Sequence, residues 1–330
     1  MTGSCTLSHT LPTVYHAFPP SVQLYGGAAT CSERAFFWSS TVLCYLLTFV
    51  RQQGRRNYSI VDRIWPLYPV VFLLQWQLQS ERLTQQSVVI QALVYTWGLR
   101  LCFNSVRRGD YQWGAEDYRW KHVQGAFSRV FGRGLVGAVV WEIFNLGFIA
   151  VFQLALLYLI AVPARLVVLG QQPNSNGGEW DVTQAMLAVG MALALVGEAV
   201  ADQQQFRFQQ RKRAQGGDRV GFVHSGLWKY SRHPNVFCEG VFWALLSVFC
   251  MRASGVDFGV CENAWLWAGA AVLALLLSSS VRLTESISTS KYPAYKAYMV
   301  KTSRVVPMLA RDNRDVVDIA HSFSFVRKQQ

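Results

Sequence analysis

The sequence has little charge. Only 15% of its 330 residues are Asp, Glu, Lys or Arg, whereas about a quarter are charged in an average soluble domain. Hydrophobic residues make up 52% of the chain and aromatic residues 14%. This composition excludes a disordered chain, a collagen-like fibre and a small disulfide-rich scaffold. The length fits two soluble domains or one polytopic membrane protein.

Patterns typical of metal sites, disulfide frameworks and secretory signals are also missing. The seven Cys are odd in number and form no C-x-x-C pair, so the sequence predicts neither a metal site nor a disulfide framework. The first thirty residues lack a basic start followed by an apolar run, which argues against a cleavable signal peptide. No RNA- or DNA-binding motif accompanies the net charge of +12, so nucleic acid is not expected as a partner.

Long apolar stretches, by contrast, recur along the whole chain. Several are close to the length of about 17 residues that a helix needs to cross a bilayer, and the second contains Pro66 and Pro69. The stretches predict an all-α, polytopic membrane protein with about seven transmembrane helices. They cover residues 35–50, 64–79, 83–99, 134–162, 182–201, 236–251 and 263–281.

Basic residues are distributed unevenly between these stretches. If all seven cross, the segments after the first, third, fifth and seventh share one side. They hold 26 of the 31 Lys and Arg, with Arg100 counted apart because it lies at the end of a stretch. Such an excess is typical of cytosolic loops. The pattern therefore predicts a cytosolic C-terminus and a luminal N-terminus. A soluble helical bundle with a basic face is the alternative, but it does not explain why charge alternates with loop number.

The same patterns predict how the chain is divided. Residues 1–33 are expected to form a flexible tail, residues 34–310 a membrane domain, and residues 311–330 a polar C-terminal tail. The segment 170–181 is rich in Gly and Asn and is predicted to form a luminal turn. The basic clusters are interpreted mainly as anchors that face membrane lipids.

Carboxylates within apolar stretches are candidates for function, because intramembrane charges are costly and usually face a cavity or a partner. Glu142 lies near the start of a long stretch, so an interfacial position would also explain it. Glu198 and Asp202 are four residues apart and share one helix face. These two residues indicate either a functional site or the end of a helix that emerges into the cytosol.

The densest polar cluster is GLWKYSRHPNVFCEG, residues 226–240. Pro234 suits the first turn of a helix, after which Asn235 and Glu239 project from one face. A cationic, aromatic-flanked helix start is suited to bind a phosphate-bearing nucleotide; a helix cap with interfacial anchors is the alternative. The polar and aromatic members of the cluster are Trp228, Tyr230, Arg232, His233, Asn235 and Glu239.

A second cluster covers residues 284–307. Three tyrosines recur there every three residues, interleaved with Lys291 and Lys296. They are Tyr292, Tyr295 and Tyr298. Such a pattern is typical of a membrane-surface belt, and it would equally supply stacking and phosphate contacts to a nucleotide.

These clusters resemble a known family. GLWKYSRHPNVFCE is similar to the C-terminal segment of the steroid 5-alpha-reductase superfamily, particularly its DUF1295-type members, whose pattern is close to GLW-x-YSRHPNYFGE. Val236 and Cys238 stand where that pattern usually has Tyr and Gly. The sterol C14 and C7 reductases share the RH-x-N core and a comparable SKY element. Further similar segments are DRIWP (62–66), WGLRL (97–101), EDYRW (116–120), EAVADQQQF (198–206) and TSKY (289–292).

The resemblance covers residues from about 60 to 310 and implies a function. Members are seven-helix membrane reductases that bind NADPH in a cytosol-facing cavity, without a separate Rossmann domain, and reduce an activated C=C bond. The substrate is then a steroid-like or other lipid, and the expected location is the endoplasmic reticulum. The cofactor-pocket residues that the resemblance implies are Asp202, Trp228, Arg232, His233, Asn235, Glu239, Arg282, Lys291, Tyr292 and Tyr298.

Two other functions stay open. S-adenosylmethionine-dependent methyltransferases of isoprenyl cysteine or phospholipid are similar through an RHP-containing segment. They typically carry a late Glu-Glu pair, where this chain has Glu285 followed by Ser286. A lipid-binding relative without catalysis is the third class.

A conjugated carbonyl that accepts hydride needs an acid near its oxygen. In the steroid 5-alpha-reductases an acidic residue and a tyrosine engage the substrate carbonyl, and the resemblance implies these roles for Asp62 and Tyr95. The phenol would donate the proton while the carboxyl group orients it. Alternatively, Asp62 caps a helix and Tyr95 only packs.

Overall fold

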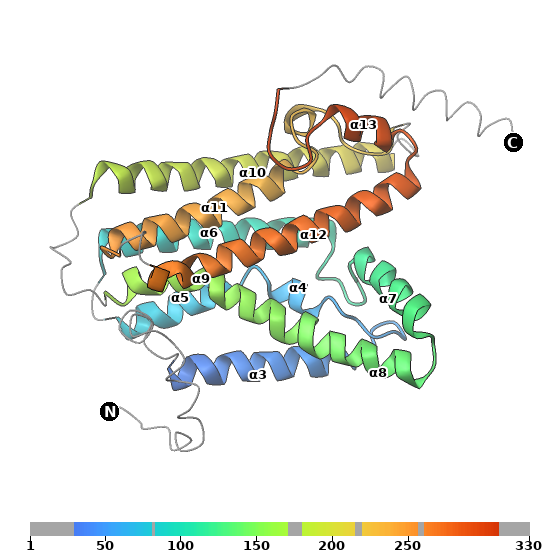
Figure 1. Cartoon of the computed structure of the whole chain (residues 1–330), viewed down its shortest axis with the longest axis horizontal. Coiled ribbons are helices and arrows are strands. Elements are labelled where there is room, and N and C mark those ends of the chain that lie inside the picture. Colours follow the sequence, from blue (N-terminus) through green and yellow to red (C-terminus); the bar gives the residue numbers. More distant parts are fainter. Residues whose placement is uncertain (1–29, 81–82, 171–179, 215–219, 257–260, 310–330) are drawn as a thin grey trace, which may run out of the picture. The chain divides into compact units, whose positions relative to one another are not determined.

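The computed structural model describes residues 30–80, 83–170, 180–214, 220–256 and 261–309, except the side chains of residues 261 and 262. Most of the described residues lie in helices, and no β-strand occurs among them, which confirms the predicted all-α class (Figure 1). The first helices are α3 (Cys31–Leu47), α4 (Ile60–Ile64), α5 (Tyr68–Gln79), α6 (Gln85–Arg108), α7 (Tyr118–Phe131), α8 (Leu135–Phe144), the π-helix η1 (Asn145–Phe152) and α9 (Gln153–Val168). Those that follow are α10 (Val182–Ala214), the 3-10 helix η2 (Gly226–Lys229), α11 (Pro234–Ala253), the 3-10 helix η3 (Cys261–Trp267), α12 (Ala268–Lys291) and α13 (Tyr295–Lys301).

The chain divides into two compact units. The first unit comprises Met1–Ala188 and Leu246–Ala271, and the second comprises Val189–Leu245 and Val272–Gln330. The boundaries fall inside α10, α11 and α12, so each unit contains part of these three helices. The predicted C-terminal tail, 311–330, lies outside the described residues, as does most of the predicted N-terminal tail.

Among the residues that the structure describes, four helical segments are long and apolar enough to cross a membrane, which supports the membrane protein that the composition predicts. They coincide with the fourth to seventh apolar stretches of the sequence. The segments are Leu135–Val168, Val182–Ala214, Pro234–Ala253 and Asn263–Lys291.

The second apolar stretch behaves differently because of its two prolines. Pro66 lies in the break between α4 and α5, and Pro69 occupies the first turn of α5. The 12 residues of α5 rise only about 18 Å, less than the roughly 30 Å of a bilayer's hydrocarbon core. This helix therefore does not cross a bilayer by itself.

A G-x-G-x-x-G stretch, residues 132–137, has the spacing of a dinucleotide-binding turn. It joins α7 to α8, however, and no strand precedes it in the described chain. Gly132 ends α7 with φ +76, and a side chain on Gly137 would collide with the Gly132 carbonyl. These glycines therefore permit a tight helix–helix turn, and the strand–turn–helix context of a Rossmann site is missing.

A buried ion pair lies in the first unit, where α5 packs against α9. Glu33 is 1% exposed, and its Oε1 accepts hydrogen bonds from Trp76 Nε1 at 2.6 Å and from Arg165 Nε at 3.3 Å. Thr30 and Glu33 form a reciprocal capping box that starts α3 at Cys31. The predicted N-terminal tail is therefore too long at its end: Glu33 belongs to the first helix. Arg165 follows the fourth apolar stretch in the sequence, but it is a buried residue of α9.

Candidate functional site

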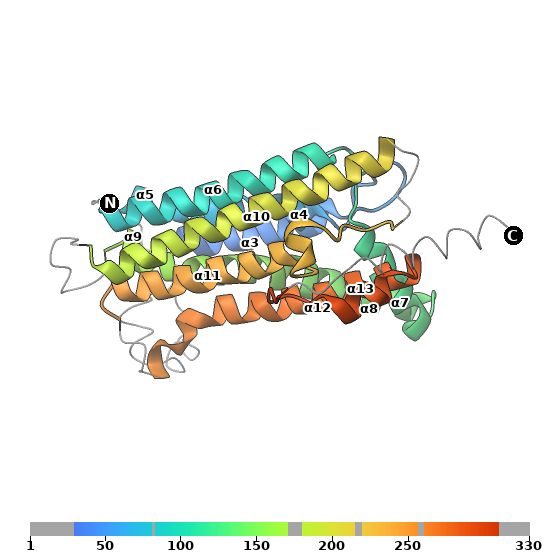
Figure 2. The ribbon, with the colours of Figure 1, turned by 90° about the horizontal axis from the view of Figure 1, so that it is seen from above.

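The candidate site lies in the second unit, at the polar end of the α10–α11 pair. The two helices run side by side (Figure 2), and small residues set their spacing. A Cβ on Gly190 would lie 3.0 Å from Leu245 Cδ1, and one on Gly197 would lie 2.8 Å from Cys238 Sγ. The same antiparallel register, continued five residues, brings Asp202 to the level of His233, the residue that precedes α11.

The loop that leads into α11 is tied to α10 by hydrogen bonds. Leu227 N donates to Gln204 Oε1 at 2.9 Å, and Trp228 Nε1 donates to the Ala201 carbonyl at 3.2 Å. Trp228 is buried. The indole predicted to line a cofactor pocket therefore anchors η2 against α10.

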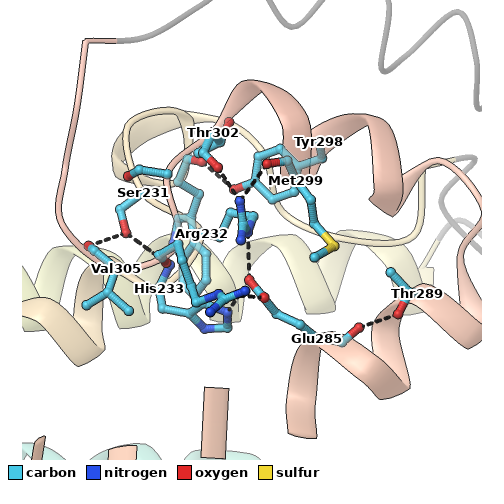
Figure 3. A network of polar contacts seen from close by, with 12 residues as sticks. Ser231, Arg232, His233, Glu285, Thr289, Tyr298, Met299, Thr302 and Val305 are labelled. Atoms are coloured by element: carbon cyan, nitrogen blue, oxygen red, sulfur yellow. Dashed lines mark hydrogen bonds and ion pairs between the residues drawn. The ribbon is translucent and has the colours of Figure 1, made fainter. Parts of the chain in front are cut away.

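Arg232 is the centre of a buried network (Figure 3). Its Nε donates to Glu285 Oε1 of α12 at 2.6 Å, and its Nη1 donates to the carbonyl oxygens of Met299, at 2.8 Å, and Thr302. The Arg232 backbone N–H also donates to the Ser303 carbonyl at 2.9 Å. One guanidinium thus links the start of α11 to α12 and to the end of α13.

The Glu285 carboxylate is shared between three basic side chains. His233 Nε2 lies 3.3 Å from Glu285 Oε1, which makes an ion pair when the imidazole is protonated. Arg304 Nε donates to Glu285 Oε2 at 3.1 Å. Glu285 itself is 3% exposed and Arg232 is 5% exposed. The sequence indicated Glu285 only as the residue that stands alone where a Glu-Glu pair was sought.

This geometry corrects the roles predicted for the two polar clusters. The predicted phosphate contact of Arg232 is not available, because the guanidinium is buried and already donates to a carboxylate and two carbonyls. Tyr298 is also buried, and its hydroxyl donates to the Trp228 carbonyl. Tyr295 and Tyr298 form a hydrophobic core with Phe222. The rings of Tyr298 and Phe222 are stacked, with their centroids 5.2 Å apart. These two tyrosines are core residues and do not form a surface belt or a stacking platform.

Tyr292 differs from these two tyrosines because it is only partly buried. Lys212 Nζ donates to its hydroxyl at 2.8 Å and to the Gly221 carbonyl at 2.7 Å. Burial raises the pKa of the Tyr292 phenol, but the hydrogen bond and charge of Lys212, with a smaller effect of Lys291, lower the pKa below its usual value. The sequence did not single out Lys212, which lies in a basic triplet.

Other predicted site residues remain at the polar end of the helix pair. The buried Asn235 Oδ1 accepts no hydrogen bond from the described residues. Glu239, one turn along α11, accepts a hydrogen bond from Trp243 Nε1 at 3.3 Å. Arg282 and Lys291, by contrast, are exposed on α12. The polar groups brought to one helix end are therefore Asp202, His233, Asn235 and Glu239.

The predicted pair of Asp62 and Tyr95 does not form in the first unit. Tyr95 OH donates to Gln91 Oε1 at 3.0 Å, whereas Asp62 Oδ2 accepts a hydrogen bond from Trp120 Nε1 at 3.0 Å. Burial raises the pKa of Asp62, although the charge of Arg119 and the Trp120 hydrogen bond oppose this. The DRIWP and EDYRW segments thus meet through Asp62 and Trp120, a contact that the sequence pattern did not predict.

Glu142, the other intramembrane carboxylate of the sequence, is part of an ion pair. Both of its oxygens accept hydrogen bonds from Arg56, and Asn145 Nδ2 donates to Oε2 at 3.3 Å. The hydrogen bond and charge of a basic partner account for a carboxylate at this depth. Glu142 therefore needs no ligand to explain it.

Comparison with known proteins identifies the family but not an activity. The family described as "Protein of unknown function (DUF1295)" matches residues 48–302. An uncharacterized protein of Schizosaccharomyces pombe is 32% identical over 280 residues, which are 80% of this chain and 76% of the yeast protein. No solved structure matches this chain.

Proposed function

This chain belongs to the DUF1295 family, and we propose that it is an NADPH-dependent membrane reductase of an activated C=C bond in a steroid-like or other lipid. The proposal includes membership of the steroid 5-alpha-reductase superfamily, whose motifs the chain resembles. It also includes a cofactor cavity at the polar, cytosolic end of α10 and α11. The observation that carries the proposal is that the buried side-chain oxygen of Asn235 accepts no hydrogen bond from the described residues.

A buried polar atom without a partner is uncommon in folded proteins and calls for a specific explanation. Asn235 Oδ1 is such an atom among the described residues. The carboxamide of a nicotinamide presents N–H donors to an acceptor of this kind. Asp202, His233 and Glu239 add acceptor and ionisable groups at the same helix end, so the residues present fit a nicotinamide nucleotide.

NADPH, when bound, supplies the hydride that reduces the double bond. The chain's part is to hold this cofactor and the lipid together in an apolar surrounding from which water is excluded. In the proposed site Asn235 binds the carboxamide. Glu285 and Arg232 keep the preceding loop in place, so that His233 and Asn235 stay at the helix end. Neither Tyr95 nor Asp62 is assigned as the proton donor, because each forms a hydrogen bond with a different side chain.

The proposal is tested by nucleotide binding. NADPH should raise the melting temperature of the detergent-solubilised protein, and S-adenosylmethionine should not. The Asn235→Leu substitution should lower the affinity for NADPH about two- to ten-fold, the usual scale for one neutral hydrogen bond of ~0.5–1.5 kcal/mol. Without nucleotide the variant should be at least as stable as the wild type, because it removes an unsatisfied buried oxygen.

Lys229→Gln is the matched control, since Lys229 is an exposed residue of η2 outside the site. It should leave NADPH binding unchanged. A melting temperature raised by S-adenosylmethionine instead of NADPH would replace the reductase by the methyltransferase. Unchanged NADPH affinity in Asn235→Leu would remove this residue from the cofactor site.

The proposed topology has seven crossings, of which α4 and α5 together make the second. It also has an endoplasmic reticulum location, a luminal N-terminus and a cytosolic C-terminus. A tag at Gln330 should therefore be cytosolic, and a glycosylation acceptor introduced within 170–181 should be modified. An acceptor introduced near Gly216 should stay unmodified. Modification near Gly216, with none in 170–181, would reverse the orientation and place the cofactor end on the luminal side.

A further inference from the structure

A depression of about 380 Å³ lies on the second unit, beside the candidate site. It is formed where the polar end of α10 faces the turn that begins η2. Its lining residues are polar or glycine, and two of them carry guanidinium groups. The lining residues are Gln204, Arg207, Gln210, Arg211, Ser225 and Gly226.

The two arginines are placed to act together. Arg207 and Arg211 are four residues apart, so they project from one face of α10, beyond its apolar part. Both are exposed, and no described carboxylate lies within ion-pair distance of either. Lys212, the next residue, is instead committed to Tyr292 and the Gly221 carbonyl. The cationic face of the depression therefore belongs to Arg207 and Arg211.

The opposite wall of the depression is held in place by a hydrogen bond from its backbone to a side chain of α10 and by a glycine in the turn. Gln204 Oε1 accepts the hydrogen bond of Leu227 N at 2.9 Å, which keeps the turn against α10. Gly226 has φ +65, and a Cβ there would lie 2.5 Å from Gln204 Oε1. Only glycine permits this close approach without strain. Ser225, just before it, adds an exposed hydroxyl to the rim.

We propose that this depression is a binding subsite for a phosphate monoester, held by Arg207 and Arg211. Guanidinium groups bind phosphate through paired charge-assisted hydrogen bonds, and the Ser225 hydroxyl and Gln210 amide add neutral donors. The inference rests on the proposed function and deepens it: the monoester is the 2′-phosphate that distinguishes NADPH from NADH. Arg207 and Arg211 are five and nine residues beyond Asp202, about 8–14 Å along the helix axis, a separation that an extended dinucleotide can bridge.

The test measures the affinities of four soluble probes for the protein reconstituted in phosphatidylcholine nanodiscs. They are NADPH, NADH, adenosine 2′,5′-bisphosphate and 5′-AMP, bound to the wild type and to the Arg207→Gln, Arg211→Gln and Arg213→Gln variants. Each of the first two substitutions should weaken NADPH and the bisphosphate about ten- to a hundred-fold and leave NADH and 5′-AMP unchanged. Arg213→Gln removes the same charge from an exposed residue of α10 outside the depression, and should change none of the four affinities.

The outcomes separate this inference from the proposed function. An NADPH-to-NADH preference unchanged in both arginine variants overturns the subsite while the reductase stands. In another outcome, the wild type binds the bisphosphate but neither NADPH nor NADH. If the two arginine variants then lose the bisphosphate, this result supports the phosphate subsite and overturns the reductase. Failure of the wild type to bind either NADPH or adenosine 2′,5′-bisphosphate overturns both.

A lipid headgroup is the other source of a phosphate monoester. The same proteins are therefore reconstituted with phosphatidic acid, and lipid retention is measured. Phosphatidic acid enrichment lost in Arg207→Gln and Arg211→Gln, with the NADPH-to-NADH ratio unchanged, would assign the depression to a lipid and overturn the 2′-phosphate assignment. Equal enrichment in all four proteins supports the dinucleotide.

Discussion

Replacing Arg232 by alanine should destabilise the protein by about 3–5 kcal/mol, the usual cost of removing one partner of a buried ion pair. The substitution leaves Glu285 buried without its closest donor and releases the carbonyls of Met299 and Thr302. Unfolding of the solubilised protein, followed by tryptophan fluorescence in denaturant, measures the loss. A fall in NADPH affinity of this variant would then reflect the lost fold and would not indicate a direct phosphate contact.

The same carboxylate supplies its own control. Arg304 donates to the other oxygen of Glu285, but its side chain is 48% exposed. Arg304→Gln should therefore cost at most about 1 kcal/mol, as exposed pairs do. The double substitution Arg232→Met with Glu285→Met should recover much of the stability lost in Arg232→Ala. Equal effects of Arg232→Ala and Arg304→Gln would contradict a structural role for the buried pair.

Replacing Arg165 by methionine should also destabilise the protein by about 3–5 kcal/mol. Glu33 would keep its buried position and the hydrogen bonds from Trp76 Nε1 and the Thr30 backbone N–H, but it would lose its cationic partner. The negative charge would then be poorly compensated among the apolar residues of α5 and α9. Thermal unfolding at neutral pH, with and without the substitution, measures the difference.

Two further variants separate the charge from the packing. Trp76→Phe keeps an aromatic ring and removes only the N–H donor, so it should cost about 1.5–3 kcal/mol, the value of a hydrogen bond to a charged group. Glu33→Leu combined with Arg165→Met removes both charges and should be closer to the wild type than Arg165→Met alone. A double variant less stable than Arg165→Met would show that Glu33 stabilises the fold even without Arg165, and would contradict a poorly compensated charge.

Several features of the protein were determined by the sequence alone. Apolar stretches of sufficient length have to form helices in a membrane, since no other single segment satisfies its backbone hydrogen bonds there. The last four stretches accordingly coincide with the four helical segments of the described residues that are long enough to cross. Pro66 and Pro69 mark the break before α5, because proline lacks the N–H that a helix interior needs. The cluster at 226–240 was likewise found from its local composition.

The roles of single side chains were decided only by the tertiary structure. Arg232 and Tyr298 look like cofactor ligands in the sequence, but their partners lie 53 and 70 residues away in the chain and occupy them in the fold. The partner of Glu33, Arg165, is 132 residues distant. Local patterns predict secondary structure, since propensity and hydrophobic periodicity are local. Whether a charged group is saturated by the protein or left for a ligand depends on which distant segments pack against it, and a pattern along one chain does not contain that pairing.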